Sequence, residues 1–199
     1  MRHTERLYRR WRLRFAEAFA QEAPRATLRL TPLTGIDAAE QLDRGAIDVA
    51  IAHLVTLPGH IESILLLRDP FVVIARRGHP IAGQNLSIED YAALNHILVS
   101  PRGDTSGALD RILVDFGLRR RIALLVATYL ALPVALAASD LVATVPSRTA
   151  RQIAATAEIE IMPLPIDFST TVSMAWHRRA ASEPAQAWFR ALLIEAASD

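Results

Sequence analysis

Short apolar runs alternate with helical segments along most of this chain, and this alternation constrains the fold more than any other feature. The predicted strands lie at 27–33, 47–52, 61–67, 71–75, 96–100, 122–127, 141–145, 159–164 and 171–176. Helical patterns separate most of them, at 7–22, 38–44, 87–94, 106–116, 129–138, 147–155 and 184–197. Strands and helices that alternate at this spacing build a parallel sheet covered by helices. The predicted fold class is therefore α/β.

One stretch, DPFVVIARRGHP at 69–80, departs from this regular pattern. Its first part, 71–75, is an almost wholly apolar run of the kind found in strands that are buried on both faces. Arg76, Arg77 and Gly78 then form a charged turn in which glycine frees the backbone, and Pro80 favours a helix start after it. We interpret the stretch as a strand that crosses from one hydrophobic unit to another.

A second crossing is predicted near 170–177. The simplest organisation is two α/β subdomains, with residues 1–74 and 171–199 in the first and residues 75–170 in the second. Movement of one subdomain against the other would pivot at the crossings. The predicted hinge residues are Arg76, Arg77, Gly78, Ser173 and Trp176. For Trp176, a place in the core is favoured over a place in the wall of a cleft.

Composition excludes several classes of function. The 199 residues are 51% hydrophobic, which is enough for a sizeable core, and the net charge of +1 favours neither nucleic acid nor an acidic partner. The lack of cysteine excludes disulfides, thiolate metal sites and cysteine nucleophiles. No apolar run is long enough to span a membrane, and no apolar signal core follows Met1. A cytoplasmic protein without membrane partners is expected.

The N-terminal segment MRHTERLYRRWRLR, residues 1–14, carries six Arg with Tyr8 and Trp11 between them. Guanidinium groups bind phosphates and aromatic rings stack on bases, so one interpretation is a nucleic-acid-binding arm. The other is the solvated start of a helix. The helix is favoured by about two to one, because one short run without a DNA-binding motif is weak evidence.

Enzyme motifs are missing from the chain. Neither of the common Gly-rich phosphate loops occurs, nor does HExxH, and the serine in GDTSG lacks the glycine spacing of a nucleophile elbow. The histidines stand at positions 3, 53, 60, 79, 96 and 177, without metal-ligand spacing. We therefore predict no catalytic residue, no metal site and no cofactor.

Polar residues gather where predicted strands end and helices begin. SPRGDT follows the strand HILVS, Thr128 and Tyr129 follow IALLVA, and Thr144 lies near the end of LVATV. Ligands bind at the edge where parallel strands end, because helix N-termini converge there. Hydroxyl and N–H groups suit a carboxylate, and Arg102 adds a bidentate charge. Each hydroxyl taken alone is better explained as a helix cap, worth about 1 kcal/mol. Three such places on one edge favour a ligand pocket.

The predicted ligand-binding residues are thus Ser100, Arg102, Thr128, Tyr129, Thr144 and His53. Of these, His53 comes from the other subdomain, at the end of the strand IDVAIA, and is expected to face the same cleft. An ordinary surface histidine at a strand end is an equally supported alternative.

Seven segments, taken together and in order, resemble one protein family. They are FAEAFAQEAP before TLRL, LDRGAIDVAIA, DPFVVIARRGHP, HILVSPRG, DLVATVPSRTA, VSMAWHRR and EPAQAWFRALL, within about residues 15–193. The chain resembles the effector-binding domain of LysR-type transcriptional regulators. The segments RRGHP, SPRG, SDLVATVP and WHRR are most similar to the branch that responds to aromatic compounds, including naphthalene-pathway and nodulation regulators.

This resemblance implies a type II periplasmic-binding-protein fold, in which two Rossmann-like subdomains are joined by two crossing strands. It implies a small effector, aromatic or a carboxylate, in the cleft between the subdomains. Ser100, Arg102 and Thr128 fall where the second subdomain of the family lines that site. It also implies a homodimer that pairs unlike subdomains, through the helices at 106–116 and 38–44.

Two features of the family have no match here. The first is the winged helix-turn-helix with its linker helix, so we expect operator DNA to be bound only through a domain absent from this chain, as in a truncated regulator. The second is the first strand of the first subdomain, which residues 1–10 do not resemble. We expect a weakened first subdomain with unpaired strand edges. The alternatives are a stand-alone periplasmic-type solute-binding protein, disfavoured by the lack of a signal peptide, and a small α/β enzyme.

Overall fold

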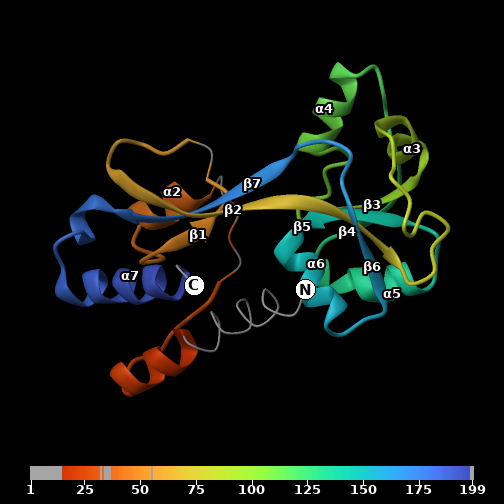
Figure 1. Ribbon diagram of the computed structural model, residues 1–199. Helices are drawn as coiled ribbons and strands as arrows, with labels where there is room; N and C mark the ends of the chain where they lie inside the picture. Colours follow the sequence, from red (N-terminus) through yellow and green to blue (C-terminus); the bar gives the residue numbers. More distant parts are fainter. Residues whose placement is uncertain (1–14, 32, 34–36, 55, 198–199) are drawn as a thin grey trace. The chain divides into compact units, whose positions relative to one another are not determined.

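The computed structural model describes residues 15–31, 33, 37–54 and 56–197, and within it the chain forms two compact units (Figure 1). The first unit is Met1–Arg68 with Thr170–Asp199, and the second is Asp69–Ser169. The chain therefore passes between units after residues 68 and 169, whereas the sequence pattern places the divisions after residues 74 and 170. Among the described residues, no helix is both long and apolar enough to cross a bilayer.

Short elements around a small core make up the first unit. Its elements are α2 (Ala38–Asp43), β1 (Ala50–Ala52), the first part of β2 (Ile61–Arg76), most of β7 (Ser169–His177), the 3-10 turn η2 (Arg178–Ala180) and α7 (Pro184–Ala197). Strand β1 pairs antiparallel with β7, Ala50 opposite Ala175. The core consists of Ala38, Leu42, Ala50, Ile61 and Ala175.

A helical segment at 15–22 packs on α7 within this unit. The ring centroids of Phe19 and Trp188 lie 6.0 Å apart, and Trp188 Nε1 donates to Glu22 at 2.6 Å. The predicted helix at 7–22 is thus confirmed for its described part. The N-terminal arm and the question of a first strand before the helix lie outside the described residues.

The second unit is a mixed sheet with helices on both faces. Its strands follow the order β2, β5 (Val142–Pro146), β3 (Asn95–Val99) and β4 (Arg121–Val126), and β6 (Ile159–Pro163) pairs with β2. Its helices are α3 (Ile88–Ala93), α4 (Ala108–Asp115), the 3-10 turn η1 (Tyr129–Ala131), α5 (Leu132–Ala137) and α6 (Ser147–Ala154). Figure 1 shows α3 and α4 on one side of this sheet and α5 and α6 on the other.

Strand β2 shows why this sheet is buried on both faces. Val73 and Ala75 belong to the core under α3 and α4, whereas Ile74 between them belongs to the core under α5 and α6. Successive side chains of a strand point to opposite faces, so a strand covered on both sides must be apolar at every position. The prediction of a doubly buried strand at 71–75 is confirmed.

Three predictions about secondary structure are wrong. No strand forms at 27–31, because that alternating segment has no partner strand in the described chain. The strands predicted separately at 61–67 and 71–75 are one continuous strand, β2. The sheet is also only partly parallel, since β3 pairs parallel with β4 and β5, while β2 pairs antiparallel with β5 and β6.

Local signals in the sequence did predict the start of α3. The hydroxyl of Ser87 accepts from the backbone N–H of Asp90 at 3.0 Å, and the Asp90 carboxylate accepts from the backbone N–H of Ser87 at 3.2 Å. This reciprocal pair satisfies two N–H groups that have no partner within the helix. A capping box with Asp in place of Glu is confirmed.

Candidate functional site

The ends of three strands form one edge of the second unit. Strands β4, β3 and β5 run parallel, so their carboxyl ends lie together, and β2 completes the edge beside β5. Val99 of β3 is in register with Val126 of β4, and the backbone N–H of Ser100 donates to the Val126 carbonyl at 2.9 Å. The segments that begin at Ser100 and Thr128 are therefore neighbours. This is the edge at which open α/β sheets bind ligands.

Ser100 begins a tight turn in which the guanidinium group of Arg102 is exposed. The turn closes through a bond from the Gly103 N–H to the Ser100 carbonyl at 3.1 Å, and Gly103 has φ +79°, which favours glycine. Ser100 itself is buried, while the Arg102 side chain is 52% exposed, with its Nε 3.6 Å from an Asp104 carboxylate oxygen. An exposed pair at this distance contributes little and leaves the guanidinium able to turn to a ligand.

Thr128 acts as the cap of the helical segment that follows it. Its hydroxyl accepts from the backbone N–H of Leu130 at 2.9 Å, at the start of η1 and α5. The adjacent Tyr129 is partly exposed, and its pKa is raised by burial and then by the negative charge of Asp69. The capping alternative is therefore confirmed for Thr128, and a hydroxyl that accepts one bond can still donate another.

Asp69 lies at the same edge, and the sequence did not single it out. The residue is buried, and its carboxylate accepts from the Ser147 hydroxyl at 2.7 Å and from the backbone N–H of Arg148 at 3.3 Å. It therefore occupies the N-terminus of α6, where a negative charge is stabilised by the helix dipole. The only sequence signal for this helix-capping carboxylate is an Asp just before an apolar run. That pattern is too common to identify Asp69 as a cap.

Thr144 belongs to a buried polar network. Its hydroxyl lies 2.6 Å from that of Tyr91, which accepts from Arg120 Nη1 at 2.9 Å, and Arg120 in turn pairs with Asp110. Burial raises the pKa of Tyr91 in spite of the nearby Arg120 guanidinium. Thr144 is thus engaged inside the unit and is the least available of the six predicted residues for a ligand.

His96 borders this network. Its Nε2 donates to the Tyr91 carbonyl at 3.0 Å, which leaves a buried Nδ1 without a hydrogen-bond partner among the described residues. Burial, aided by the Arg120 guanidinium, lowers the pKa of His96 to about 4. The ring is therefore neutral in the folded unit at neutral pH.

His53 and the predicted hinge residues have structural contacts of their own. His53 Nδ1 lies 3.1 Å from the carbonyl of Thr171, within the first unit. Arg76 binds Asp140 with Nε and Nη2 at 2.9 and 2.6 Å, and Arg77 binds Glu158 at 3.0 Å.

The remaining hinge candidates are Gly78, with φ +68°, Ser173, opposite Ala52, and Trp176, which donates to Glu62 at 3.0 Å. The candidates at 76–78 lie inside the second unit and those at 173 and 176 inside the first, away from the passages after residues 68 and 169. The hinge stays a prediction.

Comparisons with known proteins agree on one family. Residues 4–198 match the LysR substrate binding domain. The transcriptional regulator SyrM of Rhizobium meliloti is 32% identical over 180 residues, which cover 89% of this chain and 55% of SyrM. The regulatory domain of MexT, a transcriptional activator of Pseudomonas aeruginosa, aligns with a TM-score of 0.82 at 26% identity, covering 96% of this chain and 93% of that one.

The effector binding domain of BenM, solved with its effector benzoate, has the same fold. It aligns with a TM-score of 0.73 at 22% identity, covering 94% of this chain and 83% of that one. The chain spans about half of SyrM. The fold is that of the effector-binding domains, which is the type II periplasmic-binding-protein class. With a family match over nearly its whole length, this chain belongs to the family of LysR substrate binding domains.

Proposed function

We propose that the chain is the effector-sensing part of a LysR-type transcriptional regulator, and that it binds the carboxylate of a small aromatic effector at the carboxyl edge of the second unit. Ser100, Arg102 and Thr128 hold the carboxylate, and Tyr129 contacts the rest of the effector. The observation that carries the proposal is the bond from the Ser100 N–H to the Val126 carbonyl at 2.9 Å, because it makes two hydroxyl-bearing segments and an exposed guanidinium neighbours.

The other helix starts in the second unit help to locate the site. Asp69 already occupies the N-terminus of α6, and the carboxylates of Asp90 and Asp110 serve those of α3 and α4. These internal anions would repel a ligand carboxylate. At the Thr128 cap the acceptor is a hydroxyl and not a carboxylate. At the Ser100 turn Arg102 lies 3.6 Å from the exposed Asp104, a weak contact that a ligand carboxylate can replace.

An aromatic effector suits the neighbourhood of Tyr129. The ring is partly exposed beside Thr128, and aromatic side chains offer both an apolar face and a polar tip to a ligand. Benzoate, the effector in the BenM structure, combines one aromatic ring with one carboxylate and is a suitable first probe.

The test is a thermal-shift and calorimetry screen of benzoate and hydroxybenzoates against the 199-residue chain. Arg102→Gln and Ser100→Ala are expected to weaken binding about tenfold or more, since each removes a bond to a charged group. Thr128→Ser, which keeps the hydroxyl, is expected to bind normally, and Thr128→Ala is expected to bind weakly.

Arg121→Gln is the matched control. Arg121 begins β4, the strand that leads to Thr128, at the end of the sheet opposite the proposed site, where it binds Asn95 at 2.8 Å. A ligand whose affinity survives Arg102→Gln, Ser100→Ala and Thr128→Ala would contradict the site. A His53→Ala variant tests separately the first unit's predicted contribution.

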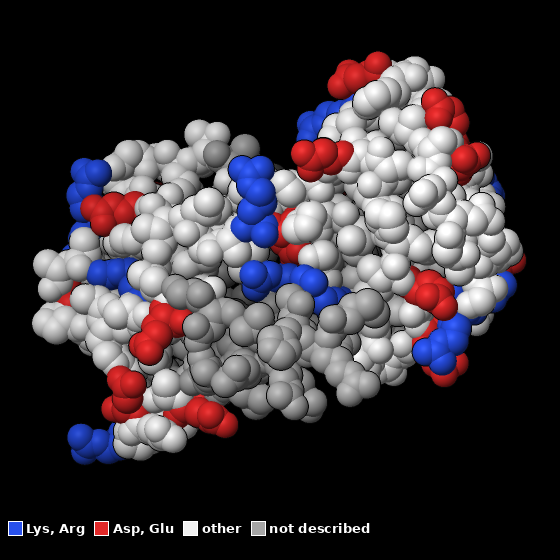
Figure 2. All heavy atoms as spheres, viewed as in Figure 1, with Lys and Arg blue, Asp and Glu red and all other residues white. Residues whose placement is uncertain are grey.

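Homodimer formation is part of the same proposal, and exposed apolar side chains of the second unit support it. Strand β4 is the edge of its sheet, and exposed apolar side chains lie on it and on α4 with its C-terminal turn: Val114, Phe116, Leu124 and Leu125. Monomeric proteins rarely leave an apolar edge of this kind open. Figure 2 shows that the second unit presents a wide uncharged area on the face in view.

Sedimentation equilibrium tests the role of these side chains. The wild-type chain is expected to be a dimer, and Leu125→Arg or Phe116→Glu is expected to give a folded monomer. A monomeric wild type, or variants that remain dimeric, would contradict this assignment. Operator binding by the whole regulator, through a winged helix-turn-helix, remains a proposal from the family.

A further inference from the structure

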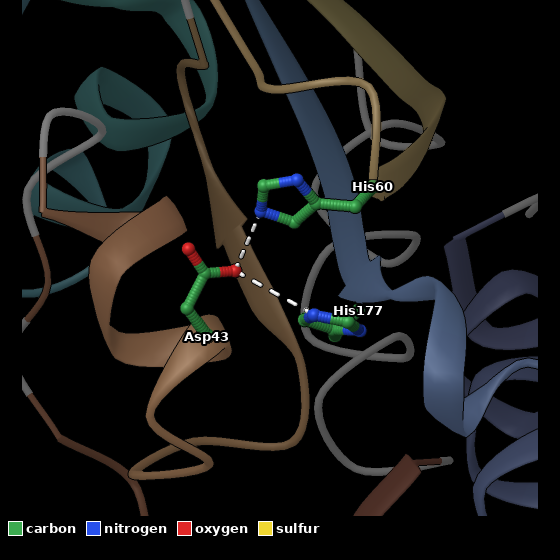
Figure 3. A group of neighbouring side chains, drawn as sticks. All are labelled: Asp43, His60 and His177. Atoms are coloured by element: carbon green, nitrogen blue, oxygen red, sulfur yellow. Dashed lines mark hydrogen bonds and ion pairs between the residues drawn. The ribbon is translucent and has the colours of Figure 1, made fainter.

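Three side chains of the first unit that can ligate a metal converge on one point (Figure 3). Asp43 is the last residue of α2, His60 directly precedes β2, and His177 ends β7. His60 Nε2 lies 2.9 Å from Asp43 Oδ1, and His177 Nε2 lies 3.7 Å from the same oxygen. Figure 3 shows both imidazole rings directed at this carboxylate. The three ligand atoms all lie within 4.8 Å of one another.

Two hydrogen bonds to main-chain carbonyls, one donated by the main chain and one by a side chain, hold the three positions together. The backbone N–H of Arg178 donates to the carbonyl of His60 at 2.9 Å, which fixes the residue before β2 beside the end of β7. Arg179 Nη2 donates to the carbonyl of Leu42 at 2.8 Å, which ties the same turn to α2. The donor atoms therefore project from a preorganised backbone, as a binding site requires.

The spacing and donor types suit a first-row transition metal. Ligand atoms about 2.0–2.1 Å from a tetrahedral Zn²⁺ lie about 3.3 Å apart, close to the two distances to Asp43. Two imidazoles and one carboxylate select Zn²⁺ and its neighbours over Mg²⁺ or Ca²⁺, which prefer oxygen ligands. The side chains are 49% exposed for His60, 41% for Asp43 and 20% for His177, so water can complete the coordination.

The present hydrogen bonds of His177 set a condition on metal binding. Its Nδ1 accepts from the backbone N–H of Arg179 at 3.0 Å, which places the ring proton of the neutral imidazole on Nε2. A histidine that ligates through Nε2 carries its proton on Nδ1 instead. Metal binding must therefore move this proton and release the Arg179 N–H, which caps the turn η2.

From this geometry we propose that Asp43, His60 and His177 form a site for a divalent first-row transition metal, with Zn²⁺ as its natural probe. The metal replaces the shared contacts to Asp43 Oδ1 and clamps α2, the start of β2 and the end of β7 together. Binding shifts the proton of His177 from Nε2 to Nδ1 and breaks the cap of η2. This site lies within the first unit and is separate from the carboxylate site of the second. A metal site here would replace the prediction, made from the histidine spacing in the sequence, that the chain has none.

Calorimetry with ZnCl₂ on metal-free 199-residue chain tests the site. We expect saturable binding of one Zn²⁺ per chain, and a loss of at least about tenfold in affinity for Asp43→Asn, His60→Ala and His177→Ala. Glu40→Gln is the matched control, because Glu40 lies on the same helix one turn earlier and pairs with Arg44 at 2.6 Å. Absence of binding by the wild type, or equal affinity in all four variants, overturns the proposal.

Nitrogen-detected NMR of the histidine rings supplies a readout that does not depend on the variants. Without metal, the His177 ring proton is expected on Nε2. At Zn²⁺ saturation it is expected on Nδ1, with a shift of the Arg179 amide resonance. A His177 ring that keeps its Nε2 proton at saturation overturns its assignment as a ligand.

Discussion

The guanidinium group of Arg120 donates hydrogen bonds to both carboxylate oxygens of Asp110, from Nε to Oδ1 at 2.7 Å and from Nη2 to Oδ2 at 3.1 Å. Its third donor, Nη1, reaches the hydroxyl of Tyr91 at 2.9 Å, and Asp110 Oδ2 also accepts from the Gly107 N–H at 2.6 Å. Although burial opposes ionisation, the bonds from Arg120 and Gly107 keep the pKa of Asp110 below its usual value. The pair fixes the start of α4 against the segment that leads into β4.

Breaking this pair is expected to destabilise the second unit strongly. The side chain of Arg120 is only 3% exposed and that of Asp110 is 20% exposed, so Asp110→Asn leaves a buried guanidinium without its counter-charge. We expect a loss of about 3 kcal/mol in the free energy of unfolding, measured by urea denaturation. Glu158→Gln, which removes the exposed partner of Arg77, is expected to cost less than about 1 kcal/mol. Equal losses in the two variants would refute this ranking.

Stability is expected to fall below neutral pH because of His96. Its pKa is lowered to about 4 in the folded unit, while in the unfolded chain it takes the ordinary value of about 6.5. Between these values the unfolded state binds more protons, so stability decreases as pH falls through this window. The loss amounts to about 3 kcal/mol and is complete only below the folded pKa.

Urea unfolding between pH 7.5 and 4 measures this effect, and His96→Gln should flatten the curve within that window. NMR titration of the His96 ring gives a direct control. A His96 that titrates near its ordinary pKa in the folded chain would show that the explanation is mistaken.

The capping box at Ser87 predicts a modest and local effect. Ser87→Ala removes the acceptor for the Asp90 N–H and is expected to cost about 1 kcal/mol. Ser87→Thr keeps the acceptor and should be close to wild type. Hydrogen exchange of the first-turn amides of α3 measures the change, and unchanged protection in Ser87→Ala would argue against a role for the cap.

Replacing Asp69 should alter Tyr129. Because the negative charge of Asp69 adds to burial in raising the pKa of Tyr129, Asp69→Asn is expected to lower that pKa towards its ordinary value. The same change weakens the bonds at the N-terminus of α6, at a cost of about 1–2 kcal/mol. Carbon-13 NMR of the labelled tyrosine ring follows the titration, with Asp167→Asn as an exposed control. A Tyr129 that titrates identically in both variants would contradict the coupling.

Local chemistry was readable from the sequence where neighbouring residues decide the structure. The apolar run at 71–75 indicated a strand buried on both faces, and Ser87 with Asp90 indicated a capping box. The order of motifs such as LDRGAIDVAIA and HILVSPRG was sufficient for the family, which the match over residues 4–198 confirms. These features depend on residues within a few positions of one another or on their order along the chain.

Tertiary structure alone decided which distant residues meet. The segment at 27–31 has a strand-like alternation but no strand forms there, because a strand needs a partner that the pattern cannot supply. In the sequence, Thr144 is a hydroxyl near the end of a predicted strand. Its bond to Tyr91 exists because β5 packs against α3, which the sequence pattern does not show. His60 and His177 lack any ligand spacing in the sequence, yet β2 and β7 bring them to one carboxylate. Side-chain spacing along a chain reports contacts within one element, whereas contacts between elements follow from strand pairing and packing.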